Sequence, residues 1–491
     1  MDRRTITGVP WTLLTYAGNK LITVATTIVL SRLLVPEDFG IITLASLAIA
    51  FANVLRDLGL GGALIVRQDL DRHAQGTVLT LMLVMGIVVG LGLAAAAPLL
   101  ADLFDEPRLD EVIVVLSIAV FLGGFNWFYE TVMQRELEFR RRFVSLALQS
   151  CSYALVAIVL AFADAGVWSL VAGQLTGYVV LAAALVTLTP YRVRPSFDRV
   201  TARSVISTGW GFMAQGGLAA VQQNSDYIAV GSVLGAGQVG LYSMSYRLSE
   251  IPYVGIADPV AKATFPSFAR MRHDGQDIIG PFLSTLRSVA LVACPLGVLL
   301  SAAAEPFTLA LLGDKWAGMV GALAVLGVWG AVRPVQATTG WLLNSAGEAK
   351  LMAGLSVIAL VPLVPLLFVA ADLGGIEAVA WIMLVDLAAS LVLIAAFAQR
   401  RVGVAVRSQA LALAPIALAC LPCWLATRLV AEGTDQMAVG VTLALASVAG
   451  VATYVVAVAL VEPGLLGRFR AQVRRSLGDA PEQPPPDRVA P

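Results

Sequence analysis

The stretch TVLTLMLVMGIVVGLGLAAAAPLL, which runs from Thr77 to Leu100, contains no charged side chain over 24 residues. The hydrocarbon core of a bilayer is about 30 Å thick, and a helix needs about 20 apolar residues to cross it. Such a helix satisfies its own backbone hydrogen bonds, as hydrocarbon requires. This stretch therefore predicts a membrane-spanning helix, and it sets the pattern for the sequence on either side.

Comparable apolar segments follow one another almost without interruption from Trp11 to Val461. Their predicted bounds are 11–31, 40–64, 77–100, 111–133, 143–163, 166–189, 204–233, 239–268, 280–304, 317–344, 351–371, 375–398, 409–430 and 437–461. The chain is 58% hydrophobic and 13% charged, whereas soluble domains are about 25% charged. We expect an all-α polytopic membrane protein with about fourteen transmembrane helices.

The charges alternate along the chain although the net charge is zero, which gives no signal for nucleic acid. Basic residues gather in every second loop, as in 135–142 and 192–203, whereas the loop 101–110, which precedes 135–142 and has the opposite phase, is acidic. Basic loops collect on the cytoplasmic side of a membrane. The alternation holds to the end of the chain, so we expect a bacterial cytoplasmic (inner) membrane protein with both termini in the cytoplasm.

The basic, proline-bearing loop 190–203 divides the predicted helices into groups. We expect a six-helix lobe at 1–200, a second at 201–405, two additional helices at 406–461 and a disordered cytoplasmic tail at 462–491. Residues 34–41 can be aligned with 234–241, an offset of 200 residues. This arrangement predicts parallel repeats related by a pseudo-two-fold axis along the membrane normal, with a transport site between them.

Some basic residues fall within the predicted helices, where an ionised group costs about 2.5–3.5 kcal/mol on insertion scales. Lys20 lies near the middle of the first helix and shares a face with Tyr16, Thr23 and Thr27. This stripe favours the wall of an aqueous cavity, and the alternative is an ion pair inside the bundle.

Three arginines are further candidates for substrate contact. Arg56 precedes Asp57, so the two form either a surface pair or part of a cavity mouth. Arg247 either pairs with Glu250 on its own helix or contacts a ligand. Arg333 immediately precedes Pro334, and a proline kink beside a buried cation is typical of the broken helices of transporters.

The segment 204–233 is the most polar of the predicted helices. Gln215, Gln222 and Asp226 share one of its faces and complete the predicted substrate-binding set. Asp258 and Asp386 are the other intramembrane acids of interest. Each is a candidate for proton or sodium coupling, or the counter-ion of a buried base.

An interior weighted to cations suggests an anionic cargo, because guanidinium and ammonium groups bind phosphate and pyrophosphate well. Tyrosines and amides on the same wall suit sugars. The sequence has no phosphate-binding loop or dinucleotide motif and only two histidines, so we expect no cofactor and no metal. The four cysteines lie in apolar stretches and are expected to be buried and unreactive.

Five stretches together resemble the polysaccharide flippases of the multidrug/oligosaccharidyl-lipid/polysaccharide superfamily, specifically the colanic-acid-exporter-like branch. They are Ser31–Gly40 (with Trp11), Asp57–Ile65, Gln134–Arg141, Gly166–Gln174 and Leu241–Leu248. The resemblance implies two six-helix lobes around a central cavity, two extra helices and alternating access. It also implies a polyprenyl-pyrophosphate-linked oligosaccharide as cargo, with a polysaccharide polymerase complex as a candidate partner.

We therefore expect a flippase and not an enzyme. One alternative is a cation-coupled drug antiporter of the same superfamily, which predicts acid-dominated cavities. Another is a membrane glycosyltransferase or glycan polymerase, whose active site needs a longer external loop than this sequence offers. A structural scaffold does not explain mid-helix charges such as Lys20 and Arg333.

Overall fold

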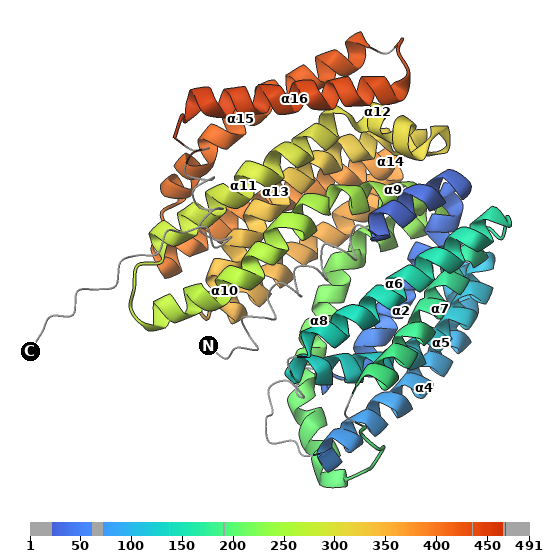
Figure 1. Cartoon of the computed structure of the whole chain (residues 1–491). Coiled ribbons are helices and arrows are strands. Elements are labelled where there is room, and N and C mark those ends of the chain that lie inside the picture. Colours follow the sequence, from blue (N-terminus) through green and yellow to red (C-terminus); the bar gives the residue numbers. More distant parts are fainter. Residues whose placement is uncertain are drawn as a thin grey trace, which may run out of the picture. The chain divides into compact units, whose positions relative to one another are not determined.

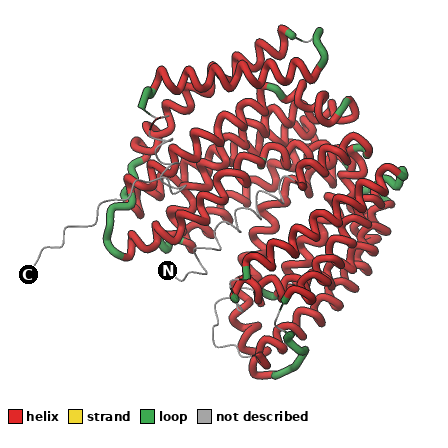
Figure 2. Tube along the Cα trace, in the orientation of Figure 1, coloured by secondary structure: helices red, strands yellow, loops and turns green. Residues whose placement is uncertain are grey.

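The computed structural model describes residues 22–60, 72–136, 138–189, 192–434, 436–464 and 467. Within these residues the chain is helical and contains no β-strand (Figure 2). Ten of the described helices are long and apolar enough to cross a membrane. The prediction of an all-α polytopic membrane protein is confirmed.

The described helices follow the predicted order along the chain (Figure 1). A short helix at Ile22–Leu33 precedes the labelled elements. The labelled elements are α2 (Pro36–Asp57), α4 (Arg72–Leu103), α5 (Arg108–Arg135), α6 (Phe139–Phe162), α7 (Val167–Leu188), α8 (Arg199–Leu234), α9 (Ala236–Ser249), η1 (Tyr253–Ala257), α10 (Asp258–His273), α11 (Ile279–Ala302), α12 (Ala304–Phe307), η2 (Thr308–Leu312), η3 (Asp314–Met319), α13 (Val320–Ser345), α14 (Ala349–Val402), α15 (Val406–Gly433) and α16 (Val439–Val461).

One predicted helix needs correction, and one predicted break is confirmed. The segment 239–268 is not one regular helix, because a π-helix at Tyr253–Ala257 separates α9 from α10. Pro252 lies at this break, and its missing N–H removes a helical hydrogen bond. The predicted break between the helices 351–371 and 375–398 is confirmed, because α14 is interrupted at Gly374 and Gly375, which are non-helical. Gly375 has φ 65°, which glycine adopts without steric cost.

The chain forms two compact units. Unit 1 comprises Met1–Ile251, Phe307–Leu326 and Glu348–Ser390, and unit 2 comprises Pro252–Pro306, Gly327–Gly347 and Leu391–Pro491. In unit 1, α2 packs against α4, α5, α8 and α9, while α6 packs against α7. In unit 2, α11 packs against α15, which packs against α16. The division into lobes at residues 200 and 405 stays a prediction.

Each unit has its own apolar core. In unit 1, Val78, Met82 and Phe128 are fully or almost fully buried between α4 and α5. In unit 2, Phe282 and Ile416 belong to a cluster built from α11, α15 and α16. Lipid-facing side chains surround these cores: Leu91 and Leu155, for example, are 68% and 66% exposed. Such apolar outer surfaces are what a hydrocarbon solvent permits.

The segment before α8 is held against α4 by polar contacts. Asp198 caps α8 by accepting hydrogen bonds from the backbone N–H groups of Val200 and Thr201. Its own N–H donates to the Thr77 hydroxyl at 3.1 Å. These contacts fix where α8 begins and so where its polar face lies in unit 1.

The cysteines depart from expectation at one position. Cys420 and Cys423 are buried and Cys294 is half-buried, but Cys151 is exposed on α6. The prediction of a buried thiol is wrong for Cys151, because the outer face of α6 points away from the core of unit 1. All four cysteines are free thiols.

Candidate functional site

The hairpin of α8 and α9 carries a buried carboxylate. Gly235 turns the chain between the two helices with φ 80°. Tyr242 Oη on α9 donates a 2.9 Å hydrogen bond to Asp226 Oδ2 on α8. The backbone N–H of Tyr227 donates to Asp226 Oδ1, also at 2.9 Å. Asp226 and Tyr242 are 1% and 0% exposed, so this acid is enclosed and hydrogen-bonded by protein groups.

Three tyrosines build an aromatic wall around this carboxylate. The Tyr227 ring lies 5.8 Å from the Tyr242 ring and 5.9 Å from the Tyr246 ring, both in edge-to-face geometry. Tyr242 is buried, whereas Tyr246 is half-buried. The wall therefore runs from a closed interior to an accessible edge, and its rings suit sugar or hydrocarbon contact.

Arg247 extends this wall as its exposed cation. It lies in the last turn of α9. Its Nη2 atom lies 3.4 Å from the Thr43 hydroxyl of α2, a long contact. The exposed guanidinium retains donors for an anionic ligand.

The polar face of α8 becomes more accessible away from Asp226. Asp226 is buried, Gln222 is half-buried and Gln215 is exposed. The structure thus places Gln215, Gln222 and Asp226 on one helix of unit 1, whose partner α9 carries Arg247. Only the accessible part of this set can meet a ligand without rearrangement.

Arg56 occupies a different environment in the same unit. It is 4% exposed and forms an ion pair with Asp57 at 2.6 Å. Its Nη1 atom donates to the Val120 carbonyl of α5 at 3.0 Å. Its guanidinium lies where a side chain on Gly123 would otherwise sit. The expected pair with Asp57 forms, but Arg56 is enclosed between α2 and α5 and is not a surface residue.

Arg333 lies in unit 2 on α13. Its guanidinium carbon is 5.2 Å from the centre of the Tyr253 ring and 5.8 Å from that of Trp329, which are cation–π distances. Its Nη1 atom donates to Gln336 Oε1 at 2.8 Å. Its Nε atom is buried without a hydrogen-bond partner among the described residues. An aromatic cage therefore orients this half-buried cation.

The other three predicted site residues, Lys20, Asp258 and Asp386, are not part of the α8–α9 hairpin. Lys20 falls outside the described residues. Asp258 forms an ion pair with Lys262 at 2.7 Å, one helical turn away, and this lysine is 51% exposed and is not a buried base. Asp386 is half-buried on α14 in unit 1. Ion coupling by Asp258 or Asp386 stays a prediction.

The sequence analysis missed several polar residues inside unit 1. Glu130 of α5 pairs with Arg142 of α6 at 3.5 Å. Asn126 donates to the backbone carbonyl of Tyr178 at 3.1 Å. Arg142 was assigned to a loop because it follows two other arginines, and only the observed helix start at Phe139 places it within α6. An acid within a predicted span was the available signal for Glu130.

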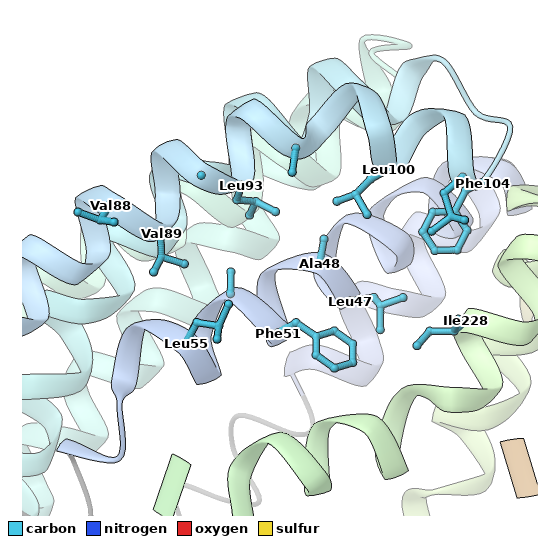
Figure 3. Close-up of a pocket in the computed structure, with 14 residues that line it drawn as sticks. Leu47, Ala48, Phe51, Leu55, Val88, Val89, Leu93, Leu100, Phe104 and Ile228 are labelled. Atoms are coloured by element: carbon cyan, nitrogen blue, oxygen red, sulfur yellow. The ribbon is translucent and has the colours of Figure 1, made fainter. Parts of the chain in front are cut away.

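A pocket of about 590 Å³ lies between α2 and α4, with Ile228 of α8 at one side (Figure 3). Its lining is wholly apolar and includes Phe51, Leu55, Leu93 and Phe104. None of the predicted substrate-binding residues lines it. The pocket can hold a hydrocarbon chain but offers no group to a sugar or phosphate.

The described part of the chain was compared with the ligand sets that metal ions need. No group of three or more His, Cys, Asp or Glu side chains there could hold a metal ion. The accessible features of unit 1 are instead an arginine, tyrosines and amides, which bind anions and sugars through hydrogen bonds.

Comparisons with known proteins relate this chain to proteins of bacterial polysaccharide biosynthesis. It is 24% identical over 381 residues to the lipopolysaccharide biosynthesis protein WzxC of Escherichia coli, covering 76% of this chain and 77% of that protein. It is 24% identical over 389 residues to the teichuronic acid biosynthesis protein TuaB of Bacillus subtilis, covering 78% and 80%.

Solved structures agree on the fold. The inward closed conformation of the lipid II flippase MurJ superposes with a TM-score of 0.75 at 12% identity, covering 96% of this chain and 99% of that chain. An inward-facing multidrug resistance MATE transporter superposes with a TM-score of 0.64 at 15% identity, covering 78% and 94%.

The model of one family, described as polysaccharide biosynthesis protein, matches residues 29–321, which is more than half of the chain. That region includes α2, the α8–α9 hairpin and Arg247. The chain therefore belongs to the polysaccharide biosynthesis protein family.

Proposed function

We propose that this protein is a flippase that moves a polyprenyl-(pyro)phosphate-linked oligosaccharide from the inner to the outer leaflet by alternating access. Family membership and the relatives WzxC and TuaB support a role in polysaccharide synthesis. The likeness to MurJ supports a fold on which lipid-linked cargo is translocated.

The observation that carries the proposal is the position of Arg247. This arginine is exposed in the last turn of α9, beside a half-buried tyrosine and within the polar face of the α8–α9 hairpin. Holding a cation within the helices of a membrane protein is costly unless water or an anion solvates it. A phosphorylated headgroup would offset that cost, while Tyr246 and Gln215 would contact the sugars.

The enclosed carboxylate of Asp226 and the exposed guanidinium of Arg247 both favour an anionic cargo over a cationic one. Asp226 is 1% exposed and hydrogen-bonded to Tyr242, so it offers little to a cationic drug. Arg247 is accessible. A drug antiporter would be expected to reverse this arrangement, with the acid accessible and the base enclosed.

The proposed setting is the cytoplasmic membrane of a bacterium, with both termini in the cytoplasm. The alternation of basic and acidic loops supports this orientation. Cargo would be loaded on the side where lipid-linked glycans are assembled, and a polysaccharide polymerase would act on the translocated product. The two-lobe division at residue 200 and at residue 405 belongs to this proposal.

The test uses the purified protein in vesicles that contain a fluorescent polyprenyl-pyrophosphate-linked oligosaccharide and no sugar donor. A carrier needs no donor, so the labelled lipid should reach the opposite leaflet, where an added glycosidase releases the label. Appearance of longer glycans only when a sugar donor is added would instead indicate a polymerase.

Site variants refine the test. Arg247→Ala and Arg333→Ala should each slow translocation at normal protein level, and Lys20→Ala should do the same. Arg247→Lys should retain part of the rate, because it keeps the charge but loses the planar fork. Normal export by all three alanine variants would reject these residues as the cargo site.

A further inference from the structure

The segment that precedes α8 is fixed to the beginning of α4 by hydrogen bonds. The backbone N–H of Ser196 donates to the Gly76 carbonyl at 3.3 Å, and the Ser196 carbonyl accepts from the Thr80 hydroxyl at 2.7 Å. The backbone N–H of Asp198 donates to the Thr77 hydroxyl at 3.1 Å. Because Thr77 begins the uncharged stretch of α4, these contacts place the segment at the boundary between hydrocarbon and water.

The helix α8 is too long to lie wholly within hydrocarbon. Its 36 residues extend about 54 Å at 1.5 Å per residue, whereas the hydrocarbon core is about 30 Å thick. A tilt of about 40°, the upper end of the usual range, would still leave the helix too long. Since α8 begins beside the start of α4 (Figure 1), its first turns lie at the membrane interface.

The first turns of α8 have a buried face and an exposed face. Ala202 and Val205 are buried within unit 1. The exposed face carries a stripe at the helical spacing i, i+4, i+7 and i+11, which consists of Arg199, Arg203, Ile206 and Trp210. The cations of this stripe therefore lie at the end nearest water, and its apolar side chains follow deeper along the helix.

The segment before α8 adds to the cationic end of this stripe. Arg192 and Arg194 are exposed, while Val193 between them is buried in the apolar core of unit 1. Phe197 is 63% exposed although it is a large apolar side chain. Arginines interleaved with exposed rings are typical of surfaces that contact lipid headgroups and the upper parts of acyl chains.

The residues between 192 and 210 favour one kind of lipid. They include four arginines and one acid, Asp198, whose carboxylate already accepts hydrogen bonds from the N–H groups of Val200 and Thr201. Such an excess of positive charge attracts anionic headgroups. The same residues include no Tyr, Asn or Gln, the side chains that suit sugars. The surface therefore fits an anionic phospholipid better than the glycan of the proposed cargo.

We propose that the stripe at the start of α8 binds an anionic phospholipid of the cytoplasmic leaflet. The lipid phosphate lies between Arg199 and Arg203, and an acyl chain follows Ile206 and Trp210. The choice of leaflet rests on the orientation given under the proposed function, whereas the binding itself does not. A bound lipid would hold the start of α8 at a fixed depth in the membrane, and with it the hairpin that carries Arg247.

The test measures how lipids with brominated acyl chains quench the fluorescence of Trp210 in nanodiscs of phosphatidylcholine. Subtracting the signal of Trp210→Phe removes the contribution of the other tryptophans. We expect brominated phosphatidylglycerol to quench Trp210 at a roughly twentyfold lower mole fraction than brominated phosphatidylcholine, since two arginines act on its charge. Added salt should reduce this preference, because salt screens exposed charges.

Paired variants assign the preference to the stripe. Arg199→Gln combined with Arg203→Gln should remove most of it, about fivefold for each arginine. Arg270→Gln combined with Arg272→Gln is the matched control, because these two arginines are also exposed but end α10 in unit 2. It should leave the quenching of Trp210 unchanged. Both double variants replace exposed side chains, so both should unfold at about the same temperature as the unaltered protein.

Three results would overturn the lipid site. They are equal quenching of Trp210 by the two brominated lipids, an unchanged preference in the Arg199/Arg203 variant, and displacement of phosphatidylglycerol by a lower mole fraction of polyprenyl phosphate. The last result would make the cargo the occupant. The measurement needs no transport. If no labelled glycan crosses any vesicle while Trp210 still prefers phosphatidylglycerol, the proposed function fails and the lipid site stands.

Discussion

Arg56 and Arg247 are arginines of the same unit, on helices α2 and α9 that pack against each other, yet their surroundings are opposite. Arg56 is 4% exposed, with Asp57 and the Val120 carbonyl as partners. Arg247 is exposed, with a long contact to Thr43. From the sequence, both residues were equal candidates for substrate contact. The packing of α5 against α2 encloses Arg56 and leaves Arg247 exposed.

The difference shows what a charge in a membrane helix implies. Burying an ionised group is tolerated where the protein supplies a counter-ion and hydrogen bonds, as it does for Arg56. Where the protein supplies little, as for Arg247, solvent or a ligand must supply the rest. Arg333 in unit 2 lies between these extremes, since rings and one amide surround it while its Nε atom lacks a partner among the described residues.

The largest expected change in stability comes from Arg56→Ala. It leaves the Asp57 carboxylate, which is 28% exposed, without its counter-ion and should lower the free energy of unfolding by about 3–5 kcal/mol at most. Thermal unfolding in detergent measures this loss. Arg56→Met combined with Asp57→Leu should recover much of it, and an unaltered single variant would show that the pair is not structural.

A smaller loss is expected from Tyr242→Phe. The change removes the hydroxyl that donates to Asp226 Oδ2 and should cost about 1.5–3 kcal/mol, the usual value for a hydrogen bond to a charged group. Tyr246→Phe is the matched control on the same wall. Equal unfolding temperatures for the two variants would contradict the assignment of Tyr242 to Asp226.

Arg247→Gln should have the opposite effect to Arg56→Ala, with little loss of stability and a strong loss of transport. Because Arg247 is exposed, we expect the free energy of unfolding to change by no more than about 0.5 kcal/mol, while translocation of the lipid-linked glycan falls strongly. Unfolding and vesicle transport are measured on the same preparation. A variant that unfolds as readily as Arg56→Ala would place Arg247 among the structural arginines.

The smallest effect is expected from Lys262→Gln. Lys262 is 51% exposed and pairs with Asp258 one turn away, and such exposed pairs contribute about 0.3–0.5 kcal/mol. Stability and transport should both stay near those of the unaltered protein. A loss of transport alone would assign Asp258 to ion coupling in place of a simple counter-ion role.

The fold was largely predictable because hydropathy along the chain identifies membrane-spanning helices without any knowledge of tertiary contacts. A helix in hydrocarbon must be long and apolar, so segments such as 77–100 can be recognised as spans from their length and composition. A departure occurred where a single residue altered helix geometry. Pro252 precedes the π-helix that interrupts the predicted helix 239–268, and hydropathy does not reveal this break.

The candidate site was less predictable, since spacing on a helix gives a face but not what covers it. Gln215 and Asp226 share a face by sequence, yet one is exposed and the other is sealed by Tyr242. Glu130 and Arg142 meet only because α5 packs against α6. Ion pairs between distant segments leave no periodic signal in a single sequence.

By itself, the sequence determined that this chain crosses a membrane many times as helices and keeps cations within them, because hydropathy and charge are properties of each residue. Only the tertiary structure decided which cations are enclosed and which are accessible, because burial depends on neighbours contributed by other helices. For the same reason, it alone brought Gly40 against Ala236 and Gly240 against Pro36.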